Sequence, residues 1–145
     1  MASVRDILAR KGSYVFTVGQ DATVLQAALL MNEHRIGALV VVEAGRVVGM
    51  FTERDVLQRV VAGQRDPALT RVADVMSSEV VCGSLETSVE EARGAMKNRR
   101  IRHLPVVDGD QALLGMVSIG DLNAHSAADN EHTIHLLQEY LHGRV

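Results

Sequence analysis

Apolar and polar residues along this chain alternate between two spacings that predict different elements. Apolar residues between 24 and 31 are three or four positions apart, which predicts an amphipathic helix. The runs 14–18, 38–42 and 47–51 are nearly continuous in apolar residues, which predicts extended segments. A second helix is expected to begin at Thr52. The first half of the chain therefore reads as a β-α-β-β-α unit.

The second half repeats this order of elements. A helical stripe over 89–96 is entered at Ser88, and apolar extended runs occupy 79–82, 104–107 and 113–117. A second helix is expected to begin at Ser118. The strands are apolar on both faces, so both faces of each sheet are expected to be covered.

Matched positions show that the second half is a copy of the first. Val89 follows Val24 by 65 positions, whereas Asp121 follows Asp55 by 66. The second copy therefore has one more residue, which we place in the turn near Gly109. Two copies at this period indicate an internal duplication rather than a solenoid.

The duplication divides the chain into segments. A loop at 63–67 joins the halves, and the similar lead segments 4–8 and 72–76 precede the two copies. We expect three units: 1–68, the first repeat with its lead segment; 69–128, the second repeat; and 129–145, a C-terminal helix. Asp129 is expected to cap that helix, whose apolar stripe could cover an edge of the core or pair with a second chain.

Composition limits the classes of partner. The 145 residues are 47% apolar, with a net charge of −3 and a single cysteine, Cys82. An acidic balance argues against nucleic acid as a partner, and the lone thiol fits a reducing compartment, where we expect it to be a core group. The sequence has neither an apolar run of spanning length nor a signal-peptide pattern, so no membrane association and a cytoplasmic location are expected.

Each copy carries a hydroxyl and a carboxylate at matched positions. Residues 49–55 (Gly-Met-Phe-Thr-Glu-Arg-Asp) return as 115–121 (Gly-Met-Val-Ser-Ile-Gly-Asp). A hydroxyl at a helix start can donate to a phosphate, and an ionised carboxylate can accept from both hydroxyls of a ribose. The same spacing is also a capping box, which merely starts a helix. The two interpretations are compatible, and both stay open at this point.

The run 36–42 (Ile-Gly-Ala-Leu-Val-Val-Val) followed by 49–55 resembles a CBS motif, named after cystathionine β-synthase. Two in tandem, over roughly 4–125, resemble a CBS pair, or Bateman module, of the small stand-alone bacterial kind. The resemblance implies an α/β fold of two β-α-β-β-α repeats with pseudo-two-fold symmetry. It also implies two clefts that bind adenosine-containing ligands, and a homodimer.

The resemblance assigns residues to each cleft. The first cleft would contain Thr52, Arg54 and Asp55, with Val81, Ile101, Arg102 and His103 from the opposing repeat. The second cleft would contain Ser118, Gly120 and Asp121, with Lys11, Tyr14, Phe16, Ile36 and Ala38 from the first repeat. Arg54 stands where the second copy has Gly120, so we expect unequal affinities or different ligands.

No catalytic constellation is recognisable in the sequence, so we expect a regulatory ligand-binding module rather than an enzyme. The expected ligand is AMP, ADP, ATP or NAD(H), with S-adenosylmethionine less favoured, and no catalytic cofactor. The bound state would pass through the homodimer to a regulated partner protein. Two alternatives stay open: a structural or protein-interaction module with unoccupied clefts, and a weak nucleotide hydrolase. His132 and His135 lack a cysteine partner, so no metal site is expected.

Overall fold

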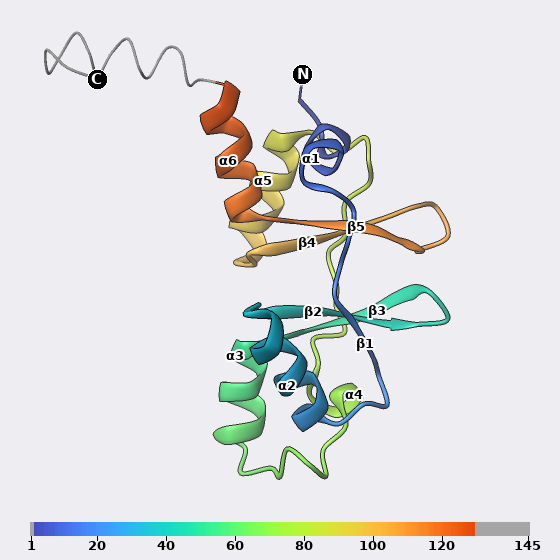
Figure 1. Cartoon of the computed structure of the whole chain (residues 1–145), viewed down its shortest axis with the longest axis vertical. Helices are drawn as coiled ribbons and strands as arrows, with labels where there is room; N and C mark the ends of the chain where they lie inside the picture. The colour runs from blue at the N-terminus through green and yellow to red at the C-terminus, as the bar shows by residue number, and fades with distance from the viewer. Residues whose placement is uncertain (1, 130–145) are drawn as a thin grey trace, which may run out of the picture.

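The computed structural model describes residues 2–129, which form two stacked α/β halves (Figure 1). The first half of the sequence contains α1 (Val4–Lys11), β1 (Thr17–Gly19), α2 (Val24–His34), β2 (Ala38–Glu43), β3 (Arg46–Thr52), α3 (Glu53–Asp55) and the π-helix η1 (Val56–Val61). The second contains α4 (Val72–Val75), α5 (Val89–Arg99), β4 (His103–Val107), β5 (Leu113–Ser118) and α6 (Ile119–Asp129). The predicted tail helix over 129–145 lies outside the described residues except for Asp129.

The two hairpins, β2–β3 and β4–β5, lie between the helices of the two halves (Figure 1). Leu39 and Val41 of β2 pack with the helices of the first half. Ala38 and Val40 point the other way, into a cluster that includes Met116 and other residues of the second half. Both faces of the first sheet are therefore covered, as its apolar strands predict.

The hairpins confirm the predicted one-residue insertion. Val41 pairs with Gly49 and Val106 pairs with Gly115, and each pair is followed by a bulge. Because the strands match in register, the extra residue of the second copy lies in the turn between β4 and β5, around Gly109.

The first strand of the second repeat is a correction to the sequence analysis. In the first repeat β1 runs parallel to β2 over three residue pairs, but residues 79–82 form no strand. Only Gly83 bridges to Val106. The cause is Pro105, which stands where β2 has Val40: Val40 donates its N–H to the carbonyl of Phe16, and a proline has no N–H to donate.

The lead helices are exchanged between the halves. Val4 of α1 is fully buried in the core of the second repeat, and its N–H donates to the carbonyl of Thr87 at 2.8 Å. Val72 of α4 is buried in the core of the first repeat, and its N–H donates to the carbonyl of Ala22 at 2.8 Å. This exchange ties the two repeats together and brings the end of α1 to the second motif.

Candidate functional site

Both copies of the motif form a capping box. Asp55 accepts hydrogen bonds from the N–H of Thr52 at 3.0 Å and from its hydroxyl at 3.2 Å. Asp121 accepts from the N–H of Ser118 at 2.8 Å, and its own N–H donates to the Ser118 hydroxyl at 3.1 Å. The capping interpretation is therefore confirmed for both copies, and any ligand role is additional to it.

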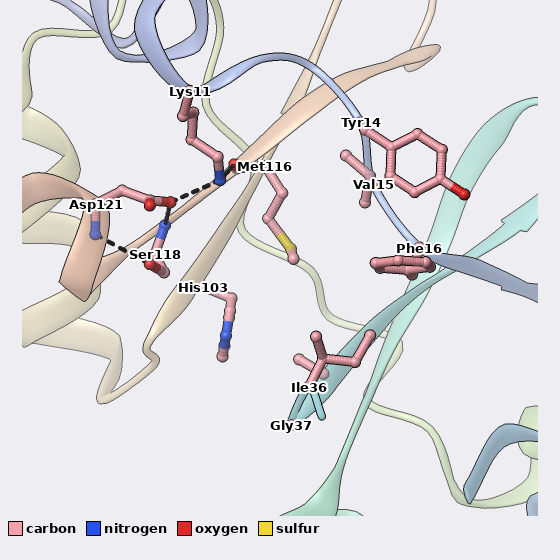
Figure 2. Close-up of a pocket in the computed structure, with 11 residues that line it drawn as sticks. Lys11, Tyr14, Val15, Phe16, Ile36, Gly37, His103, Met116, Ser118 and Asp121 are labelled. Carbon is pink, nitrogen blue, oxygen red and sulfur yellow. Dashed lines mark hydrogen bonds and ion pairs between the residues drawn. The ribbon is translucent and has the colours of Figure 1, made fainter. Parts of the chain in front are cut away.

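The second motif lines a cavity of about 280 Å³ between the repeats (Figure 2). Its lining includes seven of the eight residues predicted for the second cleft: Lys11, Tyr14, Phe16, Ile36, Ala38, Ser118 and Asp121. The eighth, Gly120, is exposed and is not part of this lining. Lys11, Ser118 and Asp121 lie on one side of the cavity, opposite Tyr14 and Phe16.

Tyr14 and Phe16 belong to a short ladder of rings. Their ring centroids are 4.9 Å apart in an edge-to-face arrangement, and Phe16 stacks on His34 at 4.0 Å. Tyr14 is 78% exposed, although its ring is one of the largest apolar groups in the chain. This side of the cavity therefore offers planar apolar surface of the kind that a purine base covers.

Lys11 joins the end of α1 to Asp121. Its ammonium lies 2.8 Å from the Asp121 carboxylate and donates to the carbonyl of Met116 at 2.9 Å. Burial alone would raise the pKa of Asp121, but hydrogen bonds from Lys11 and Ser118 outweigh it and hold that pKa below its ordinary value. Asp121 is therefore a carboxylate acceptor at neutral pH.

His103 lies in this cavity, whereas the sequence analysis placed it in the first cleft. It corresponds to Ala38 at the start of the matching strand, so the two residues begin the inner strands of the two repeats. Burial, and then the positive charge of Arg102, lower the pKa of His103 below its ordinary value. Its imidazole is therefore neutral at pH 7.

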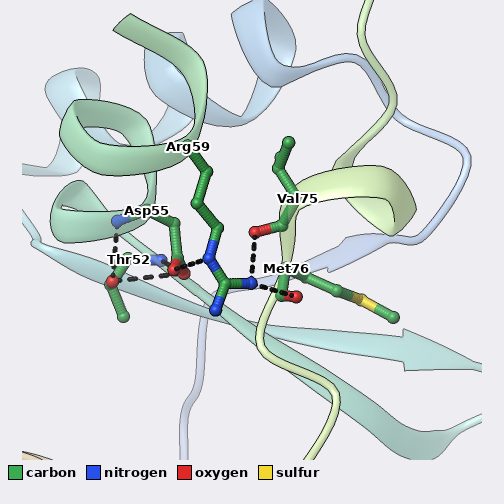
Figure 3. Close-up of polar contacts among 5 residues, drawn as sticks. All are labelled: Thr52, Asp55, Arg59, Val75 and Met76. Atoms are coloured by element: carbon green, nitrogen blue, oxygen red, sulfur yellow. Dashed lines mark hydrogen bonds and ion pairs between the residues drawn. The ribbon is translucent and has the colours of Figure 1, made fainter. Parts of the chain in front are cut away.

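At the first motif, Arg59 of the following helix lies beside the Asp55 carboxylate (Figure 3). The guanidinium of Arg59, one turn after Asp55, lies 3.7 Å from the Asp55 carboxylate. It also donates to the carbonyls of Val75 and Met76, at 3.2 and 2.9 Å. The Asp55 side chain is only 8% exposed, against 25% for Asp121.

The other residues predicted for the first cleft are distributed over core and surface. Val81 and Ile101 pack against the core of the second repeat. Arg54 and Arg102 are exposed. Sequence reasoning missed four residues of the two motif regions: Val15, Gly37, Met116 and Arg59. Three of them adjoin predicted residues or the motif in sequence, so their place in the lining could have been inferred; the link from Arg59 to Asp55 required only the i, i+4 helical spacing.

Other chemistry is limited in the part of the chain that the structure describes. Residues 2–129 contain no group of three or more side chains suited to a metal ion. Within the same residues, no helix is long and apolar enough to cross a membrane. Cys82 is half-buried, and burial raises the pKa of its thiol. A thiol in that state is a poor nucleophile.

Comparison with known proteins then decides the family. The sequence profile of the CBS domain matches this chain twice, at residues 4–62 and 72–127. The chain belongs to the CBS domain family. The fold class and the resemblance proposed from sequence are thereby confirmed.

Individual CBS proteins resemble this chain over most of its length. The CBS domain-containing protein YhcV of Bacillus subtilis is 43% identical over 122 residues, covering 84% of each chain. A mitochondrial CBS domain-containing protein of Arabidopsis thaliana is 34% identical over 97% of this chain and 72% of its own. A solved protein with CBS domains from Burkholderia ambifaria superposes with a TM-score of 0.83 at 39% identity, covering 88% of this chain and 96% of that one.

Proposed function

We propose that this CBS pair is a regulatory module that binds an adenosine-containing ligand between its repeats. The candidates are AMP, ADP, ATP and NAD(H), with S-adenosylmethionine less favoured. The bound state would change the relative position of the two repeats within a homodimer and so act on a partner protein.

The cavity at the second motif carries this proposal. It combines a carboxylate acceptor (Asp121), a hydroxyl (Ser118) and a cation (Lys11) with the exposed ring of Tyr14 on the opposite side. A nucleotide needs the same combination, because its base is planar and apolar while its ribose and phosphate are polar. The volume of about 280 Å³ is close to the lower end of the roughly 300–1,000 Å³ of small-molecule sites.

A solved CBS domain pair in complex with 5′-methylthioadenosine and S-adenosylmethionine shares the fold, with a TM-score of 0.78 at 22% identity. That similarity concerns the fold alone. The ligands of that protein are nevertheless adenosine compounds, which supports testing this class first.

Exposed apolar side chains support the homodimer. Leu25 and Leu29 on α2 are 42% and 59% exposed, and Leu57 and Val61 on η1 are 63% and 62% exposed. A second copy that covers these side chains would remove them from water. The molecular mass in solution tests this step, with Leu29→Glu as the variant that should dissociate the dimer.

The test of ligand binding is a titration of the full chain with adenosine, AMP, ADP, ATP, NAD, NADH and S-adenosylmethionine. At least one compound should raise the melting temperature. At a hundredfold excess over its Kd, it should add about 2.7 kcal/mol to the free energy of unfolding. Ser118→Ala should weaken that binding, because it removes a donor without changing the charge. If no compound binds the parent protein, the proposal is wrong.

One observation at the first motif favours one occupied cleft over two. There Thr52 donates two hydrogen bonds to one oxygen of the Asp55 carboxylate, and the Arg59 guanidinium lies 3.7 Å from the other oxygen, so Asp55 is less accessible to a ribose than Asp121. A stoichiometry of one ligand per chain would fit this arrangement, with the first motif serving structure alone.

A further inference from the structure

The two lead helices differ in length, and the difference lies beside the cavity. The side chain of Leu8 on α1 lies against Gly115, and the side chain of Met76 lies against the matching Gly49. Leu8 therefore corresponds to Met76, 68 positions later. Val18 corresponds to Gly83, only 65 positions later. The first copy therefore has three more residues between its lead helix and its first strand.

These residues extend α1 by about one turn and introduce a cation. α1 has eight residues, whereas α4 has four. The added turn contains Lys11, which reaches the Asp121 carboxylate and the Met116 carbonyl. In the other repeat the chain turns away earlier, and Ser77 pairs its backbone with Met50 by two hydrogen bonds of 2.9 Å. Lys11 consequently has no counterpart at the first motif.

Lys11 has a hydrogen-bond donor to spare. An ammonium carries three N–H groups, and the described residues accept two of them. Among the cavity-lining residues the other basic side chain is His103, which burial and Arg102 keep neutral. Lys11 is thus the fixed positive charge of the described lining, and its side chain is 34% exposed.

We propose that Lys11 is the specificity-determining residue of this cavity: its ammonium selects adenosine ligands that carry a phosphate over adenosine itself. The inference rests on the proposed function, since it presupposes that a nucleoside occupies the cavity. The ribose would take Asp121 as its acceptor, and a phosphate on that ribose would take the remaining N–H of Lys11. A charge-assisted hydrogen bond of this kind is among the stronger ones in proteins.

The test compares Lys11→Met with Arg10→Met in the full chain, using adenosine and AMP as probes. Both variants remove one positive charge from the last turn of α1, but Arg10 is exposed and is not part of the lining. By calorimetric titration, Lys11→Met should weaken AMP about tenfold or more and leave adenosine within about threefold. Arg10→Met should change neither, and Lys11→Arg should keep most of the preference for AMP.

Three results separate the possible failures. If Lys11→Met leaves both affinities at the values of the parent protein, Lys11 does not select the phosphate. If it weakens both probes equally, Lys11 only positions Asp121, and the inference is also overturned. If neither probe binds the parent protein, the inference fails together with nucleoside binding. A melting curve for each variant shows that it is folded, so loss of AMP binding cannot be mistaken for unfolding.

Discussion

Two copies of one motif have become different sites in this molecule. Asp55 is buried and bound by Thr52, with Arg59 beside it, whereas Asp121 stands at the edge of a cavity and is held by Lys11. Both carboxylates cap a helix in the same way. The difference shows that a duplicated capping box supplies only the frame, and that residues outside the motif determine whether its carboxylate is accessible.

Those outside residues are Arg59, on the helix that follows the first motif, and Lys11, on the exchanged lead helix α1. Directly after α4, Ser77 pairs with Met50 of β3. The carbonyls of Val75 and Met76 accept hydrogen bonds from Arg59. After α1 the chain continues for an extra turn and delivers Lys11 instead. The three-residue insertion in one lead segment therefore contributes to the difference between the two motif regions, together with Arg59, whose matching position in the second copy is His125.

The largest expected contrast is in stability. Asp55→Ala removes a buried carboxylate that accepts two hydrogen bonds and leaves Arg59 without its ion pair, so we expect a loss of about 3 kcal/mol. Asp121→Ala removes a more exposed cap and should cost about 1 kcal/mol. Urea denaturation measures both. Equal losses would contradict the division between a structural and an accessible carboxylate.

The glycines that begin the two motifs give a second contrast. An added Cβ at Gly49 would lie 2.5 Å from the Met76 sulfur and 3.0 Å from the backbone carbonyl oxygen of Ser77. At Gly115 the three nearest atoms all belong to the side chain of Leu8, the closest at 2.9 Å. Gly49→Ala should therefore cost about 2 kcal/mol and Gly115→Ala about 1, by thermal or urea denaturation. A larger loss at Gly115 would show that the first motif is not the more tightly closed one.

The pH dependence of stability tests the environment of His103. Because the folded state lowers its pKa, the unfolded chain binds a proton more readily just below pH 6.5, and stability should fall as pH decreases through that value. His103→Gln should flatten the dependence of the melting temperature between pH 7 and 5. An unchanged slope in His103→Gln would contradict the lowered pKa of His103.

The smallest expected effect is the loss of stability at acid pH that depends on Asp121. Its folded-state pKa lies below 3.8, so the stability it contributes is present above pH 3.8 and is lost as pH falls through the lower folded value. Asp121→Asn should reduce the loss of melting temperature in that acid range. If the melting temperature falls with acid pH as it does in the parent protein, the hydrogen bonds from Lys11 and Ser118 contribute nothing measurable to stability.

Much of this arrangement follows from the sequence, because the periodic elements and the doubled motif are local patterns. The prediction of a strand over 79–82 was wrong. The pattern of those residues does not show that the partner strand contains Pro105, which has no N–H to donate. His103, which the sequence analysis assigned to the first cleft, lines the cavity at the second motif, because it begins a strand where the two repeats meet. The exchange of α1 and α4 is a matter of tertiary packing, and the contact between Lys11 and Asp121 spans 110 positions.

The central claim is that the second motif, rather than the first, is the ligand site. Calorimetric titration of AMP into the Asp121→Asn and Asp55→Asn variants tests it most directly, at a temperature where both are folded. We expect Asp121→Asn to weaken AMP at least tenfold, because it removes a charged acceptor, and Asp55→Asn to leave the affinity within about threefold. The reverse result, with AMP lost in Asp55→Asn and retained in Asp121→Asn, would contradict the claim.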